Sequence, residues 1–76
     1  MGRMSEPTSV EIRGEMIRLG QLLKLAGVVE DGAQARALIE NGHVRVDGEV
    51  ERRRGRQVPL GGLVELPGGA LVVTTA

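Results

Sequence analysis

The hydrophobic positions of this chain first follow a helical spacing and later alternate with polar residues. The first apolar residues at helical spacing are Leu19, Leu22, Leu23 and Ala26. This spacing predicts a helix that packs through one face, and Gly27 lies where a left-handed residue commonly ends a helix. Lys24 falls away from the apolar face.

A second helix is predicted from about residue 32 to residue 41. Asp31 can accept hydrogen bonds from first-turn amides, and Gln34 can reciprocate as in a capping box. The buried face of this helix is formed by Ala35, Leu38 and Ile39. Gly42 is the expected left-handed cap, and Arg36 and Glu40 have the spacing of an exposed ion pair.

Alternating patterns predict strands on both sides of the helices. Residues 10–17 suggest a short strand or ribbon that Gly14 interrupts, and a strand through Val44 and Val46 follows the second helix. The Asp47-Gly48 pair signals a hairpin turn. Because a two-residue turn would put Val50 on the wrong face, we predict a three-residue loop, with Gly48 at positive φ, that pairs Val46 with Val50.

Three further short strands are predicted at residues 57–60, 63–66 and 70–74, between turns rich in glycine. The expected fold is α+β, with two short packed helices against a small antiparallel β-sheet. Residues 1–9 are polar, contain Pro7 and show no hydrophobic period. They are predicted to form a mobile N-terminal tail, followed by a single domain over residues 10–76.

Composition limits the kinds of chemistry that this chain can perform. Its 76 residues include no cysteine, which excludes disulfides and thiolate metal sites and suits a reducing cytoplasm. The N-terminus has no apolar stretch of signal-peptide length, so we expect a cytoplasmic protein and no membrane partner. Without Phe, Tyr or Trp, any nucleic acid would be held by phosphate contacts, shape and arginine stacking.

Positive charge is concentrated in one segment although the net charge is zero. Ten Lys and Arg residues balance ten Asp and Glu residues, which argues against a general attraction to nucleic acids. No acid interrupts the arginine cluster, defined as Arg52, Arg53, Arg54 and Arg56. Such runs are usually solvated loops, but guanidinium groups bind phosphates bidentately, and three consecutive arginines repel one another. We therefore predict an anionic partner.

Other polar residues give weaker indications. Lys24, Arg36 and Arg45 extend the basic surface if the helices pack side by side with the hairpin behind them. Arg36 is equally suited to an ion pair with Glu40. His43 is the only histidine and has no partner for a metal site or a catalytic dyad, so it is expected to cap a helix, lie at the surface or contact a phosphate or sugar.

The sequence shows no catalytic constellation. The glycine pairs at 61–62 and 68–69 lack the spacing and the following lysine of a phosphate-binding loop. Glu49 and Glu51 are expected in a solvent-open hairpin, with nothing to raise a pKa for acid–base work. We predict a protein that is not an enzyme, with no catalytic residue, metal, cofactor or small-molecule substrate.

Residues 35–50, ARALIENGHVRVDGEV, together with residues 18–27, RLGQLLKLAG, resemble the S-four RNA-binding domain, known as the αL motif. The family pattern has a leucine-rich helix, a second helix of the form A-R-x-L-I-x-x-G, then V-x-V-(N/D)-G and a basic strand. The matching positions are Ala35, Arg36, Leu38, Ile39, Gly42, Val44, Val46, Asp47 and Gly48. The resemblance covers about residues 18–66, and the whole chain looks like the small stand-alone S-four-like proteins of bacteria.

This resemblance implies a ribosome-associated protein that binds structured RNA, either ribosomal RNA or tRNA. Many family members begin the second helix with Ser-Arg, where this chain has Asp31 and Gly32. The lost cation is expected to shift the RNA footprint. The predicted RNA-binding residues are Lys24, Arg36, His43, Arg45, Arg52, Arg53, Arg54 and Arg56.

The alternative function is a protein-interaction module. In that case the arginine cluster docks an acidic partner, or a sheet edge accepts a strand from another chain. Net neutrality and the glycine at position 32 favour this alternative. A monomer on RNA and a dimer that shares a sheet edge are equally compatible with the sequence.

Overall fold

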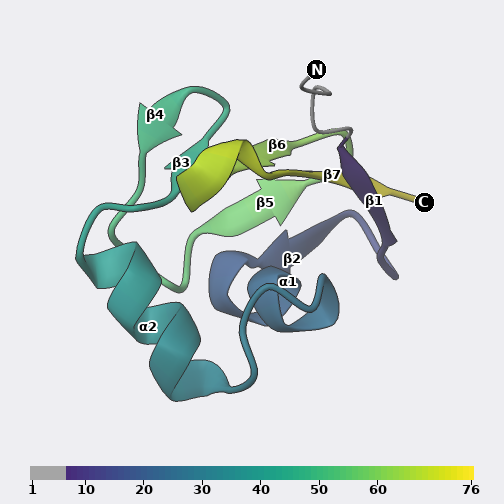
Figure 1. The fold of residues 1–76 in the computed structure, drawn as a ribbon. Coiled ribbons are helices and arrows are strands. Elements are labelled where there is room, and N and C mark those ends of the chain that lie inside the picture. Colours follow the sequence, from purple (N-terminus) through teal and green to yellow (C-terminus); the bar gives the residue numbers. More distant parts are fainter. Residues whose placement is uncertain (1–6) are drawn as a thin grey trace.

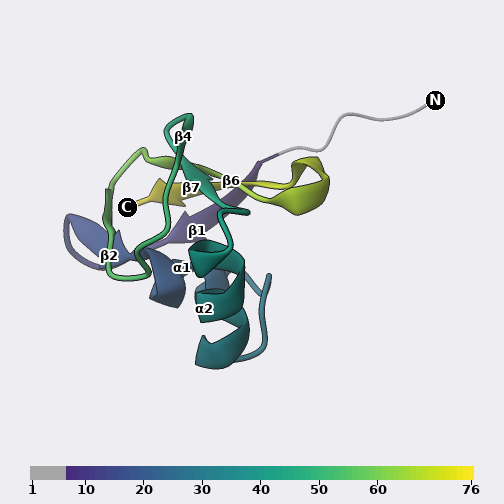
Figure 2. The same cartoon turned by 90° about the vertical axis from the view of Figure 1, so that its left-hand side faces the viewer.

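Two helices cover one side of a small sheet in the computed structural model, which describes residues 7–76 (Figure 1). The elements in chain order are β1 (Thr8–Glu11), β2 (Met16–Arg18), α1 (Leu19–Leu25), α2 (Gly32–Glu40), β3 (Arg45–Val46), β4 (Glu49–Val50), β5 (Gln57–Pro59), β6 (Leu63–Glu65), a 3₁₀ turn (Pro67–Gly69) and β7 (Leu71–Thr75). Figure 2 also places both helices on the same side of the sheet. The predicted α+β class is confirmed.

The main sheet has five strands in the order β1-β7-β6-β3-β4, and β2 and β5 form a separate antiparallel pair. Because β1 runs parallel to β7, the sheet is mixed, and the prediction of an antiparallel sheet was wrong in this respect. A parallel pair needs a long connection between its strands. Here almost the whole domain, including both helices, forms that connection.

The first two residues of strand β1 belong to the predicted tail. Thr8 and Ser9 pair with Val72 and Val73, although both side chains are exposed. Backbone pairing does not require apolar side chains, so the hydrophobic pattern missed these two residues. The rest of the predicted tail, apart from Pro7, lies outside the described residues.

The core lies between the helices and the main sheet. Val46, Val64 and Val72 are adjacent across three strands and are buried against the helices. From the helices, the fully buried side chains are Leu19, Leu22, Leu23 and Ile39. This aliphatic packing fixes the position of α1 against α2.

The helix ends follow the sequence prediction closely. The Gln34 amide donates to Asp31 Oδ1 at 2.9 Å, while Gln34 Oε1 accepts from the Glu30 amide at 2.7 Å, one residue earlier than in the usual capping box. Gly42 has φ 77° and Gly27 has φ 75°, which confirms both left-handed positions.

The hairpin between β3 and β4 differs from the prediction. Val46 pairs with Glu49 and Arg45 with Val50, so the turn has two residues and the predicted three-residue loop was wrong. Asp47 and Gly48 have φ values of 51° and 89°, as a type I′ turn requires. Asp47 also exchanges hydrogen bonds with Leu63, which secures the turn against β6. In this register Val50 lies opposite Arg45 and is 48% exposed.

Candidate nucleic-acid interface

A basic groove lies where the beginnings of α1 and α2 meet the arginine cluster. We call it the interhelical groove, and its volume is about 290 Å³. It is lined by Arg18, Gly20, Lys24, Gly32, Ala35, Arg54 and Gly55. In residues 7–76, no ion pair neutralises Arg18, Lys24 or Arg54. The groove therefore offers three cations to an anionic ligand.

A shallower depression continues from this groove along α2. It has a volume of about 690 Å³ and shares Gly32 and Arg54 with the interhelical groove. Arg36 and Glu40 also line it, and Arg36 Nε donates to Glu40 Oε2 at 3.1 Å, which confirms the predicted pair. Lys24, Arg36 and Arg54 are thus brought to one continuous surface.

Backbone hydrogen bonds attach the arginine cluster to the first turn of α1. The Leu19 amide donates to the Arg56 carbonyl at 2.8 Å, and the Gly20 amide donates to the Arg54 carbonyl at 3.0 Å. First-turn amides have no partner within their own helix. By accepting from two of them, the cluster becomes part of the wall of the groove.

Glu51 organises two of the four arginines. Its side chain is buried, with 6% of the residue exposed, so the prediction of a solvent-open carboxylate was wrong for Glu51, whereas Glu49 is exposed. Glu51 Oε2 accepts from the backbone amide and Nε of Arg53, both at 3.0 Å. Glu51 Oε1 accepts from Arg56 Nη1 at 2.6 Å and from Arg53 Nη2 at 3.4 Å. We call these three residues the Glu51 cluster.

The Glu51 cluster strongly favours the ionised carboxylate. Hydrogen bonds from the Arg53 side chain are the largest cause, and the bond from Arg56 acts in the same direction, while burial opposes both. Together they lower the pKa of Glu51 from 4.5 to about 2. The same contact raises the pKa of the Arg53 guanidinium. Arg53 and Arg56 are therefore partly neutralised within the protein.

Arg52 lies at the other end of α2. Its Nη1 is 3.5 Å from the Glu40 carbonyl, and a Cβ added to Gly42 would be 2.9 Å from the same nitrogen. A cation near the last carbonyls of a helix is favoured by the helix dipole. The four arginines are thus divided between the end of α2, the Glu51 cluster and the interhelical groove.

Besides Arg52, two further predicted candidates lie away from the groove. Arg45 pairs directly with Glu65 and Val50, so its side chain is on the sheet face opposite the buried Val46. His43 lines a different hollow, with Val28 and Leu38. The surface that we predicted to unite Arg45 with the helices is therefore divided by the sheet.

Arg18 belongs to the groove but was not among the predicted residues. It immediately precedes α1, and pairing with Gln57 in β5 brings it near Arg54. That pairing joins segments far apart in the chain. No local pattern around Arg18 distinguishes it from an ordinary exposed arginine.

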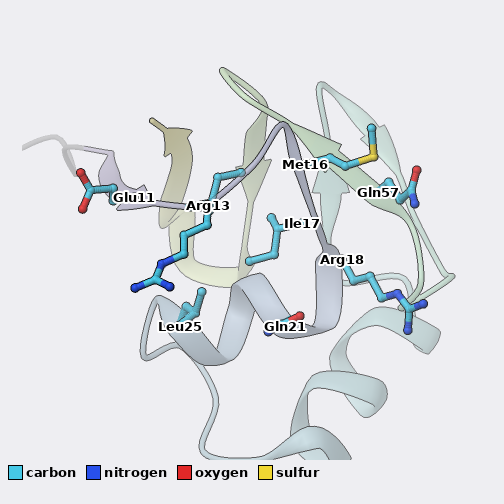
Figure 3. Close-up of a pocket in the computed structure, with 9 residues that line it drawn as sticks. Glu11, Arg13, Met16, Ile17, Arg18, Gln21, Leu25 and Gln57 are labelled. Carbon is cyan, nitrogen blue, oxygen red and sulfur yellow. The ribbon is translucent and has the colours of Figure 1, made fainter.

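A second concave surface lies between β2 and the outer side of α1. Figure 3 shows Arg13 and Arg18 at opposite ends of this hollow, with Ile17 between them. Its volume is about 580 Å³, and the exposed side chains of Met16 and Leu25 contribute apolar surface to it. Within residues 7–76, no group of His, Cys, Asp or Glu side chains could hold a metal ion.

Comparison with known proteins identifies the family. The model of the S4 domain family matches residues 10–74, and the chain therefore belongs to this family, as its resemblance to the S-four domain predicted. It is 42% identical over 65 residues to the probable ribosome maturation protein RlbA of Bacillus subtilis, covering 86% of this chain and 89% of that protein. It is also 42% identical over 57 residues to the putative RNA-binding protein YbcJ of Escherichia coli, covering 75% and 81% of the two chains.

The fold is shared with a solved structure. The solution structure of Escherichia coli YbcJ, described as revealing an αL motif involved in RNA binding, superposes with a TM-score of 0.68 and 37% identity over 96% of this chain and 95% of that one. A tyrosine–tRNA ligase of Burkholderia lata is 39% identical over 74% of this chain, which corresponds to only 14% of the ligase. The described part of this chain has no helix of sufficient length and apolarity to span a membrane.

Proposed function

We propose that this chain is a non-enzymatic, cytoplasmic RNA-binding protein whose single domain holds structured RNA in the interhelical groove. The observation that carries the proposal is the convergence of Arg18, Lys24 and Arg54 on one groove without ion-pair partners among residues 7–76. Membership of the S4 domain family and the description of YbcJ as an RNA-binding protein support it.

Ribosomal RNA is the proposed ligand. Support comes from RlbA, which is named a probable ribosome maturation protein and aligns with most of this chain. Arginine and lysine side chains supply phosphate contacts, and no aromatic residue is present to stack on unpaired bases. We therefore infer that the protein recognises the shape and backbone of folded RNA more than its sequence.

Arg54 takes the place of the cation that many family members carry at the start of the second helix. Gly32 occupies that position here, and it lines the groove together with Arg54. A Cβ added at Gly32 would meet no atom within 4 Å, so the groove is open at this point. Arg36 extends the phosphate-binding surface along α2 if RNA competes with Glu40 for its guanidinium.

A salt titration of RNA binding tests this proposal. Labelled ribosomal RNA fragments are titrated with the native protein and with Lys24→Gln/Arg54→Gln, and affinity is followed by fluorescence anisotropy. We expect the variant to bind about thirtyfold more weakly at low salt, and its log–log salt slope to fall by roughly 0.7 to 0.9 for each lost phosphate contact, the range between single strands and duplex DNA.

The matched control is Arg13→Gln/Arg45→Gln, which removes the same charge from residues outside the groove. We expect this variant to retain most of its affinity and its salt slope. If both double variants weaken binding equally, net charge and not the groove determines affinity. If the native protein binds no RNA at low salt, the proposal is wrong.

A second candidate function is the docking of a protein partner at the hollow of Figure 3. The exposed Met16 and Leu25 favour it, because Met and Arg are enriched in protein interfaces and Arg13 and Arg18 flank these apolar side chains. The native protein, purified from its own cells, should then carry a protein partner, and the Leu25→Gln variant should not. Absorbance at 260 nm should show no co-purified nucleic acid. Co-purified RNA that Leu25→Gln leaves in place would argue against this candidate.

A further inference from the structure

We propose that Glu51 is a positioning residue for RNA binding, which holds Arg53 and Arg56 so that Arg54 is presented to the interhelical groove. This inference rests on the proposed function and divides the arginine cluster by role. Arg54 contacts RNA, whereas Arg53 and Arg56 serve mainly to shape the segment that carries it. An acid in the middle of a basic surface thus promotes the binding of a polyanion.

The contacts of Glu51 fix the chain on both sides of Arg54. One carboxylate oxygen accepts from the Arg53 backbone amide at 3.0 Å, and the other accepts from Arg56 Nη1 at 2.6 Å. The Arg56 amide also donates to the Arg53 carbonyl at 3.1 Å, which closes a turn with Arg54 inside it. These bonds leave the Arg54 backbone little freedom.

The same turn faces the start of α1. The carbonyls of Arg54 and Arg56 accept from the Gly20 and Leu19 amides, so the turn is attached to the helix as well as to Glu51. The Arg54 side chain then lines both the interhelical groove and the depression along α2, where Arg18, Lys24 and Arg36 also lie. Held in this way, Arg54 loses less conformational entropy when RNA binds.

Charge alone predicts the opposite effect of Glu51. A carboxylate near phosphate groups is repulsive, so removing it should strengthen RNA binding if Glu51 only offsets the charge of neighbouring arginines. A positioning role predicts weaker binding after the same change, because Arg54 is no longer held at the groove. The sign of the effect therefore separates the two explanations.

The experiment compares Glu51→Gln with Glu49→Gln. Both variants remove one negative charge, but Glu49 is exposed and makes no ion pair among the described residues. With ribosomal RNA at low salt, we expect Glu51→Gln to bind about tenfold more weakly and Glu49→Gln to bind as tightly as the native protein or slightly better. Glu51→Gln binding as tightly as Glu49→Gln would overturn the inference.

A double-mutant cycle distinguishes positioning from general destabilisation. In an Arg54→Gln background, Glu51→Gln should weaken RNA binding no further, because the residue that it positions is already gone. Additive losses would overturn the inference. If Arg54→Gln alone leaves affinity unchanged, then the groove assignment under the proposed function fails, which is a separate result.

Thermal melting tests whether each variant is folded at the assay temperature. If Glu51→Gln is not, Arg56→Lys replaces it, since this change keeps the charge but shortens the reach and removes the guanidinium that contacts Glu51. We expect roughly fivefold weaker RNA binding by the folded Arg56→Lys protein, and unchanged affinity would overturn the inference.

Discussion

Arg54 and Arg56 are two residues apart in the sequence but have different environments in the structure. Arg56 is half-buried, with a side chain 31% exposed, and lies 2.6 Å from the Glu51 carboxylate. Arg54 is exposed and lines a groove with Arg18 and Lys24. The comparison shows that a run of like charges is not one surface. An arginine that is paired with a buried acid stabilises the fold, whereas an arginine without an ion pair remains available to a ligand.

The largest expected effect on stability comes from Glu51→Gln. This change removes a buried carboxylate that accepts hydrogen bonds from the Arg53 backbone amide and from the half-buried Arg56, so we expect the free energy of unfolding at neutral pH to fall by about 2 kcal/mol. Urea denaturation measures the loss. In Glu49→Gln, the matched exposed variant, a change above about 0.5 kcal/mol is not expected.

The effect of Glu51 also has a defined pH dependence. Because folding lowers the pKa of Glu51 to about 2, its contribution is complete above the ordinary value of 4.5 and is lost as pH falls from there towards the folded value. The stability difference between native protein and Glu51→Gln should therefore be constant above about pH 5.5 and should narrow on acidification. A difference independent of pH would contradict the ion-pair explanation.

The comparison between the two arginines can be tested directly. Arg56→Gln should lower the free energy of unfolding by about 1 kcal/mol, since it removes the shortest bond to a buried carboxylate. Arg54→Gln should change the free energy of unfolding by less than about 0.5 kcal/mol, but it should weaken RNA binding more than Arg56→Gln does. Thermal melts measure the stability of the two variants, and anisotropy titrations measure their RNA affinity. Equal losses of stability in the two variants would contradict the division of roles.

Gly32→Arg should strengthen RNA binding by about fivefold, because it adds a cation at the edge of the groove. The site has room, since a Cβ there meets no atom within 4 Å, and arginine also favours a helix more than glycine does. Anisotropy titrations measure the gain, and Gly32→Gln is the neutral control. Equal affinities of the two variants would show that RNA does not reach the start of α2.

The smallest effect is expected at the outer hairpin. Val50 is 48% exposed, so Val50→Thr should change the free energy of unfolding by less than about 0.5 kcal/mol. A three-residue loop would have buried this side chain. Its replacement by threonine would then lower the free energy of unfolding by more than ~1 kcal/mol. Urea denaturation therefore also tests the register of the hairpin.

The helices could be predicted from the sequence because local patterns determine them. The apolar spacing of α1, the cap at Asp31 and the left-handed Gly42 all depend on neighbouring residues, and the structure confirms each one. The parallel pairing of β1 with β7 could not be predicted in this way. It joins Thr8 to Val72, and no local pattern records such a distant partner.

The candidate site was predictable only in part, for the same reason. Lys24, Arg36 and Arg54 share a surface as expected, but Arg18 reaches it through its pairing with β5. The burial of Glu51 was also missed, because the predicted three-residue loop put Val50 on the buried face and Glu51 on the exposed one, whereas the observed two-residue turn reverses the two faces. A count of charges does not distinguish Glu51 from an exposed acid, although its hydrogen bonds hold Arg53 and Arg56 in place.

The parallel pairing of β1 with β7 has a consequence for synthesis. Residues 8–11 are synthesised well before their partner strand at residues 71–75, which comes last among the described elements of the domain. Strand β1 must therefore wait unpaired while the helices and the β3–β4 hairpin, which depend on local contacts, form first. We expect the sheet to close in a final step, so that a chain arrested before residue 71 has both helices and an unpaired first strand.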